Sequence, residues 1–298
     1  MGDNRVKKYM MQQNIYACKF GIFQDLPVMK SQKSFYNDDF NIAPPYEYGN
    51  VLVNTKHSID VANEYAQNGL NPVVVNTVSK DFTGNNLDMS EGILDAYINI
   101  RTSFNKTLNT YGLYPLNDGV VYAQNVYIIR DDAMQFVKKE QVKKISMITV
   151  SLDKEIEYET VINEKHFPVD KYIEISQMIE TVFQTAIVGK NDTIIFDDFG
   201  CKTYNYPINN IISMLNTSIY KYGHLVKNIV VAINVSNHNE MGYSTKFNEN
   251  LVHPQVYIQE FIDKEKKIMS EMENSLNEQK KLVSTADDKF NPFANISN

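Results

Sequence analysis

Residues 79–96, SKDFTGNNLDMSEGILDA, combine small, polar and acidic side chains in a pattern suited to phosphate binding. They follow the apolar run NPVVVN and lead into a predicted helix. A loop between a strand and a helix turns backbone N–H groups toward an anion, and its glycines let the backbone approach closely. Gly84, Asn85 and Asn86 occupy the turn. Asparagine is the non-glycine residue that best tolerates a positive φ, so these residues can keep such a turn.

A second polar segment, DTIIFDDFGCKTYNYP (192–207), also follows an apolar run. Lys202 either pairs with a phosphate or fills the pocket, and Tyr204 either stacks on a ligand or packs in the core. We expect Cys201 to be a small buried side chain and not a nucleophile, because no histidine lies near it in the sequence. Gly200 and Asn205 complete the candidate binding loop.

Other kinds of chemistry find less support in the sequence. The five histidines have no ligand spacing, so we predict neither a metal site nor a cofactor; they are His57, His166, His224, His238 and His253. The net charge of −7 argues against nucleic acid as a general partner. The basic run VKKEQVKK (137–144) is interpreted as a solvated surface.

The composition also suggests where the protein works. The two cysteines, Cys18 and Cys201, form no CxxC pair, which favours a reducing, cytoplasmic setting. No apolar run approaches the ~18 residues of a membrane span, so no membrane partner is expected. Abundant Asn, Lys, Ile and Tyr with no Trp suggest an AT-rich genome such as that of a large virus, whose protein would act in the host cytoplasm.

The elements that must position the two loops alternate between strand and helix. Apolar runs predict strands, and recurrence at helical spacing predicts helices. The strands are expected at 50–54, 71–76, 119–130 (one strand or two joined by a bend), 143–152, within 192–200 (a strand running into a loop) and 226–235, and the helices at 58–69, 90–112, 170–191 and 206–223. This alternation predicts a three-layer α/β/α domain over 49–236. Ligands in such folds sit beyond the carboxyl ends of the strands, where both polar loops begin.

The rest of the chain flanks this domain. Residues 1–48 are interpreted as a mixed, loop-prone N-terminal extension, 237–283 as a linker and C-terminal helix, and 284–298 as a disordered tail. Apolar residues recur every seven positions over 255–283, at Ile262, Met269, Leu276 and Val283. This helix either packs on the domain or self-associates as a short coiled coil, or binds another protein.

Four stretches in this order resemble the microbial poly(ADP-ribose) glycohydrolase family over about 50–235: NTVSKDFTGNN, YPLNDGVVYAQNVYIIRDD, KKISMITV and DTIIFDDFGCKTYNYP. The resemblance implies a macro-domain-like fold that binds ADP-ribose. The family has an Asn-x-Ala-Ser turn, which Asn76 and Ser79 match with Val78 in place of alanine. It then has three glycines, which correspond to Gly84, Asn85 and Asn86 in this sequence.

The resemblance also implies where catalysis would reside, and there the sequence departs from the family. A Gln-Glu-Glu segment, whose second glutamate is the catalytic acid, corresponds to Leu94, Asp95 and Ala96. The family's Gly-Cys-Gly loop, followed by an aromatic residue and an asparagine, carries Lys202 at its second glycine. Cleavage of a ribosyl bond needs an acid to protonate the leaving oxygen, which alanine cannot supply.

Three hypotheses follow. The leading one is a degenerate, non-hydrolytic pseudoenzyme that binds ADP-ribose or a related nucleotide, or that sequesters or scaffolds. The ligand would meet Asn76, Ser79, Gly84, Asn85, Asn86, Gly200, Cys201, Lys202, Tyr204 and Asn205. The first alternative is an active ADP-ribosyl glycohydrolase that uses Asp95 or Glu91. The second is an assembly protein with a dead pocket whose contacts run through 255–283.

Overall fold

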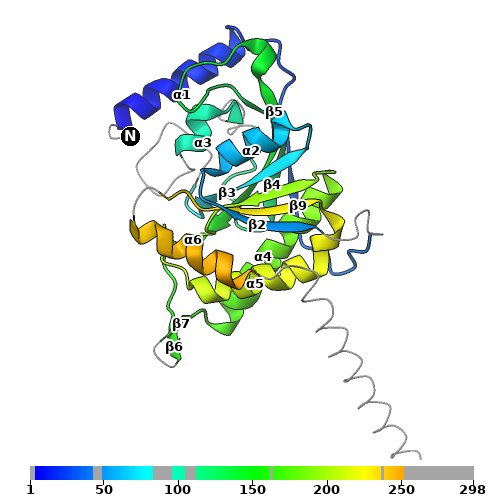
Figure 1. The fold of residues 1–298 in the computed structure, drawn as a ribbon, viewed down its shortest axis with the longest axis vertical. Helices are drawn as coiled ribbons and strands as arrows, with labels where there is room; N and C mark the ends of the chain where they lie inside the picture. The colour runs from blue at the N-terminus through cyan, green and yellow to red at the C-terminus, as the bar shows by residue number, and fades with distance from the viewer. Residues whose placement is uncertain are drawn as a thin grey trace, which may run out of the picture. The chain divides into compact units, whose positions relative to one another are not determined.

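The computed structural model describes residues 4–42, 49–82, 96–104, 112–161, 164–235 and 238–251. Its centre is a seven-stranded sheet in the order β1-β4-β5-β3-β8-β9-β2 (Figure 1). The strands are β1 (Lys30–Ser34), β2 (Asn50–Asn54), β3 (Pro72–Ser79), β4 (Val120–Ile128), β5 (Lys143–Leu152), β8 (Thr193–Phe196) and β9 (Asn228–Ala232). The five strands from β5 to β2 are parallel, whereas β4 is antiparallel to both β1 and β5. A short hairpin, β6 (Glu159–Val161) and β7 (Glu164–His166), lies apart from this sheet.

Helices cover both faces of the sheet. α2 (Ser58–Gln67) packs on β3, β5 and β8, and α4 (Val169–Val188) and α5 (Ile208–Tyr222) pack on the other face. Alternation along β3 shows the two cores: Val73 and Val75 join the α4/α5 core, and Val74 and Val78 join the α2 core. The predicted three-layer α/β/α fold is confirmed.

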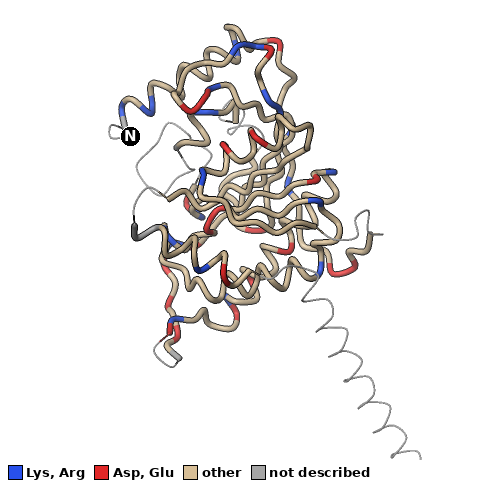
Figure 2. The backbone as a smooth tube through the Cα atoms, viewed as in Figure 1, with Lys and Arg blue, Asp and Glu red and all other residues tan. Residues whose placement is uncertain are grey.

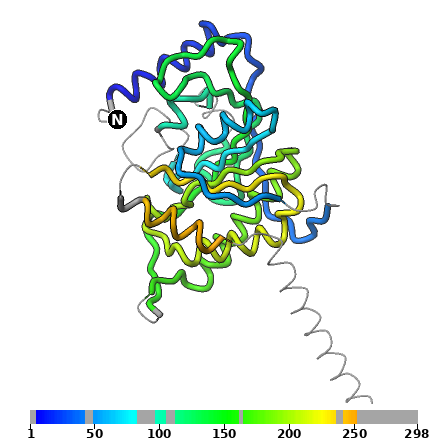
Figure 3. Tube along the Cα trace, viewed as in Figure 1, coloured from blue at the N-terminus to red at the C-terminus, as the bar shows by residue number. Residues whose placement is uncertain are grey.

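Residues 4–34 are more ordered than their sequence suggests. They form α1 (Asn4–Lys19) and β1, which pairs with β4 at the sheet edge (Figure 3). β1 reads KSQKS and has no apolar alternation, which is why the pattern misses it; an edge strand can remain polar. α1 is held by Asn14, whose buried amide donates to the carbonyl oxygen of Ile100 at 2.6 Å. Whether 1–48 behaves as a separate extension stays a prediction.

The predicted long helix 90–112 is shorter in the described residues. α3 (Ala96–Arg101) stops because the next residues pair with β4: Thr102 bridges Ile128, and the Ser103 N–H donates to the Tyr127 carbonyl at 2.9 Å. The Ser103 hydroxyl accepts the Tyr127 N–H at 3.0 Å in return. The prediction ran past Arg101 because apolar residues continue at helical spacing there, although the backbone pairs with β4 instead.

The remaining predicted elements lie close to their expected positions. β4 bends at a bulge between Ala123 and Val126, where Asn125 has φ +59°. α6 (His238–Asn250) lies within the segment predicted as a linker. The C-terminal helix 255–283 and the tail 284–298 lie outside the described residues. Of the helices that the structure describes, none has both the length and the apolar character to cross a membrane.

Candidate functional site

The carboxyl ends of β3, β5 and β8 meet at one edge of the sheet, because these strands are parallel. The loop after β8 is tied to β3 there: the Thr77 hydroxyl donates to Asp197 Oδ2 at 2.8 Å. The other oxygen of Asp197 accepts the Phe199 N–H at 2.8 Å, which fixes the start of the loop. The structure therefore brings the end of β3 and the candidate loop 197–205 side by side.

Asn76 is buried in β3 at 1% exposure. It shares its face of the sheet with Val74 and Val78, so its side chain turns toward the α2 layer. Neither its Nδ2 nor its Oδ1 makes a hydrogen bond with any described residue. A buried polar group normally has a partner, so this carboxamide is an exception that calls for a physical explanation.

Only the start of the turn after β3 lies within the described residues. Ser79 is buried, and its hydroxyl accepts the Asp81 N–H at 3.2 Å to start the turn. The candidate residues Gly84, Asn85, Asn86, Glu91 and Asp95 lie outside the described residues. Ala96, which the resemblance aligns with the family's acid, is the first residue of α3.

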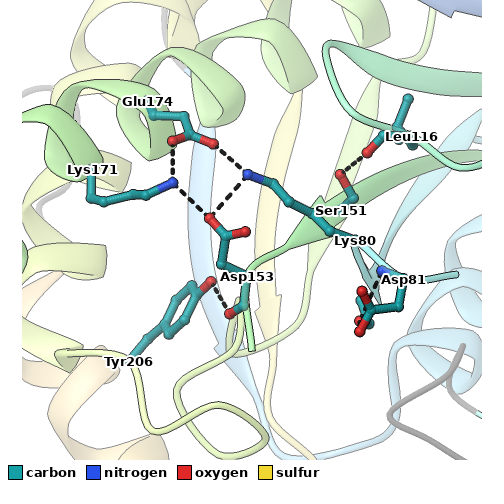
Figure 4. Close-up of polar contacts among 9 residues, drawn as sticks. Lys80, Asp81, Leu116, Ser151, Asp153, Lys171, Glu174 and Tyr206 are labelled. Atoms are coloured by element: carbon teal, nitrogen blue, oxygen red, sulfur yellow. Dashed lines mark hydrogen bonds and ion pairs between the residues drawn. The ribbon is translucent and has the colours of Figure 1, made fainter. Parts of the chain in front are cut away.

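An ion-pair cluster that the sequence analysis missed lies beside this turn (Figure 4). Lys80 and Lys171 each donate to both Asp153 and Glu174, over distances of 2.6–2.9 Å. Partial burial raises the pKa of both carboxyl groups, but hydrogen bonds from the two lysines outweigh it, and both pKa values lie below their ordinary ones. The Tyr206 hydroxyl donates to the Asp153 carbonyl oxygen at 2.7 Å and so links the cluster to the loop after β8. Each lysine is neutralised locally, which leaves little charge for a phosphate.

Gly200 sits where the loop after β8 folds against the sheet end. Its φ is +86°, and a Cβ there would lie 3.0 Å from Leu152 Cδ1 and 3.1 Å from Tyr206 Cδ2. Cys201 is 1% exposed. Burial, followed by the carboxylates of Asp198 and Asp197, raises the pKa of the Cys201 thiol far above its ordinary value. This thiol is buried as expected, and its protonated form is a poor nucleophile.

The last three candidate residues have side chains that lie in different places: Lys202, Tyr204 and Asn205. Lys202 Nζ donates to the Asn234 carbonyl at 3.2 Å and lies 3.5 Å from Asp198 Oδ2. Tyr204 packs on the α4/α5 core, on the opposite side of the sheet from Asn76. Asn205 borders a groove of about 230 Å³ whose lining includes none of the other candidate residues within the described part of the chain. The structure thus does not gather all three around Asn76.

A carboxylate next to α3, that of Asp60, is already engaged. Asp60 of α2 accepts from the buried Arg101 guanidinium and from the Tyr97 hydroxyl. Both carboxylate oxygens of Asp60 are thus taken up by contacts within the protein. Among the described residues, no three His, Cys, Asp or Glu side chains cluster closely enough to hold a metal ion. Acidic and basic residues are interspersed over the described chain (Figure 2).

A second groove, of about 430 Å³, lies between the C-terminal half of α1 and Phe136. Gln12, Gln13 and Tyr16 contribute to its lining, and none of the predicted site residues that the structure describes does. It is therefore separate from the strand-end site.

Comparisons with known proteins agree with this architecture. No protein-family model matches the sequence, and no curated protein matches it. Solved structures do: a poly(ADP-ribose) glycohydrolase from Thermomonospora curvata superposes with a TM-score of 0.58 and 9% identity, over 83% of this chain and 99% of its own. Its complex with the inhibitor ADP-HPD gives a TM-score of 0.61 and 10% identity, over 82% and 98% of the two chains.

A second organism gives the same result. The enzyme from Deinococcus radiodurans, in complex with ADP-ribose, superposes with a TM-score of 0.54 and 10% identity, over 84% of this chain and 92% of its own. Identities near one in ten are too low to transfer an activity, but the coverage includes nearly the whole of each enzyme. The chain therefore has the fold of the microbial poly(ADP-ribose) glycohydrolases.

Proposed function

We propose that the chain binds ADP-ribose, or a closely related nucleotide, at the carboxyl edge of its sheet and does not hydrolyse it. The observation that carries this proposal is the buried and unpartnered carboxamide of Asn76. It stands at the position of the family's Asn-x-Ala-Ser turn, in a fold shared with enzymes solved with ADP-ribose or ADP-HPD.

The chemistry of an amide suits this ligand. A carboxamide carries two N–H donors and an acceptor oxygen, so it can bind two neighbouring ribose hydroxyls at once. Leaving a buried polar group unsatisfied costs about 1–3 kcal/mol. A ligand that supplies the missing partners recovers that cost on binding, which makes Asn76 a natural contributor to affinity.

The lack of hydrolysis rests on Ala96. In the register of the family motif this residue takes the place of the catalytic acid, and an alanine cannot donate a proton. Loss of a positioned acid typically lowers the rate by about 10²–10⁴-fold. Asp60, which the structure places beside α3, is engaged by Arg101 and does not replace it.

Isothermal titration of ADP-ribose into the full-length protein tests binding. We expect a dissociation constant in the micromolar range, and about a tenfold weaker one for Asn76→Ala. Asn191→Ala is the matched control: this buried asparagine is fully engaged with Tyr122 and Asn71, so the variant should lose stability but keep its affinity. No heat at millimolar ADP-ribose would refute the proposal and leave the assembly role through 255–283.

A separate assay tests the absence of hydrolysis. Incubation of the wild type with poly(ADP-ribose) should release no ADP-ribose above a blank. In a separate binding measurement, the variant Ala96→Glu should bind the polymer no more weakly than the wild type. Turnover by the wild type would contradict this part of the proposal. Asp95→Ala and Glu91→Ala would then identify which carboxyl group supplies the proton.

A further inference from the structure

We infer that the hydroxyl groups of Thr149 and Tyr114 extend the Asn76 site and bind the ribose hydroxyls of the same ligand. This inference rests on the proposed function and names two specificity residues that the sequence motifs do not contain. It begins from their position in the sheet.

Thr149 lies directly opposite Asn76 in the β3–β5 register. It is fully buried, and it shares its face of β5 with Met147, which belongs to the α2 core as Val74 and Val78 do. Each residue stands three positions before the end of its strand, at Ser79 and Leu152 respectively. The two side chains therefore form one row across the sheet, just inside the edge where ligands bind in this fold class.

Tyr114 reaches the same row from the segment before β4. Its ring packs edge-on against Phe82 with centroids 5.0 Å apart, on the α2 side of the sheet. Burial raises the pKa of its hydroxyl to about 12, and the neighbouring Thr149 hydroxyl moderates that rise. Tyr114 Oη therefore lies near the Thr149 hydroxyl, although neither oxygen makes a hydrogen bond that meets geometric criteria.

Four polar atoms in this row lack a hydrogen bond to any described residue: Asn76 Nδ2, Asn76 Oδ1, Thr149 Oγ1 and Tyr114 Oη. An isolated buried atom of this kind is unfavourable, and native structures rarely leave several together unless something pairs with them. The row contains donors and acceptors but no charged group, so it matches a neutral polyhydroxyl group and not a phosphate. A ribose is the part of a nucleotide with that chemistry.

Two near-isosteric variants, Thr149→Val and Tyr114→Phe, test the inference. Since each removes a hydroxyl that has no partner in the free protein, we expect unfolding midpoints equal to or above that of the wild type. The affinity for ADP-ribose, measured by titration calorimetry, should fall about three- to tenfold in each.

Partnered hydroxyls supply matched controls. Thr185 is buried and donates to Ser34 Oγ at 2.8 Å, and Tyr122 is buried and donates to Asn191 Oδ1 at 2.8 Å. Thr185→Val and Tyr122→Phe should therefore show the opposite pattern, a lower unfolding midpoint with unchanged affinity.

The outcomes separate this inference from the proposed function. If the wild type binds ADP-ribose and Thr149→Val and Tyr114→Phe bind it equally well, the inference fails alone. That result, with reduced stability in both variants, would mean that a buried water pairs these hydroxyls. If the wild type does not bind, both the inference and the proposed function fail.

Discussion

Gly200→Ala tests how tightly the loop after β8 is held against the sheet. The backbone at Gly200 has φ +86°, which costs a residue with a Cβ about 1 kcal/mol. The added methyl group would also meet Leu152 at 3.0 Å, Tyr206 at 3.1 Å and Tyr204 at 3.2 Å, tighter than ordinary van der Waals contact. Overpacking of this kind costs about 1–3 kcal/mol, so the total loss in the free energy of unfolding should be about 2–4 kcal/mol.

Gly69→Ala is the matched control for Gly200→Ala. Gly69 also has a positive φ, +79°, but no atom lies within 4 Å of the Cβ that alanine would add. It should therefore lose only the backbone contribution of about 1 kcal/mol. Urea unfolding of the two variants and the wild type measures the difference. Equal losses would refute the reasoning, because they would show that the loop yields to the methyl group at no cost.

Two further predictions concern charged side chains. The pKa values of Asp153 and Glu174 lie below their ordinary 3.8 and 4.5, so their pairing stabilises the fold above those values and the stabilisation disappears as pH falls through the lowered ones. In Lys171→Met, the fall in unfolding free energy between about pH 5 and about pH 2 should be smaller than in the wild type. Asp60→Asn removes the carboxylate from the buried Arg101 guanidinium and should cost about 3 kcal/mol in urea unfolding at neutral pH.

An exposed pair calibrates both experiments. Asp25 and Lys139 are 2.8 Å apart and largely open to solvent, so Asp25→Asn should cost less than about 1 kcal/mol. A loss for Asp60→Asn no larger than this would show that Arg101 does not depend on its carboxylate partner. An unchanged pH profile in Lys171→Met would show that the ion-pair cluster does not govern acid stability.

Local sequence patterns were sufficient for most of the sheet. The strands predicted at 50–54 and 143–152 coincide with β2 and β5, because an apolar run between turn residues is a property of neighbouring residues alone. The same holds for the bend in β4, which is marked by Gln124 and Asn125 inside an otherwise apolar strand. The resemblance motifs, which are also short and local, indicated the fold that the structural comparisons show.

Tertiary structure decided whatever depends on residues far apart in the chain. β1 is a strand because β4 offers it an edge, and α3 ends at Arg101 because β4 captures the backbone that follows. Lys80 meets Asp153 and Glu174 only after β3, β5 and α4 have packed together. The spacing of apolar residues along the chain does not predict such pairings, because they form between residues that are far apart in the sequence.

The candidate site shows the same division. The sequence alone placed Asn76 in a strand, and its resemblance to the family aligned Asn76 with a motif and Ala96 with the catalytic acid. Only the folded chain decided that Asn76 lacks a partner and faces the same core as Thr149 and Tyr114. The physical reason is that hydrogen-bond satisfaction depends on what surrounds a side chain in space, which the order of residues does not state.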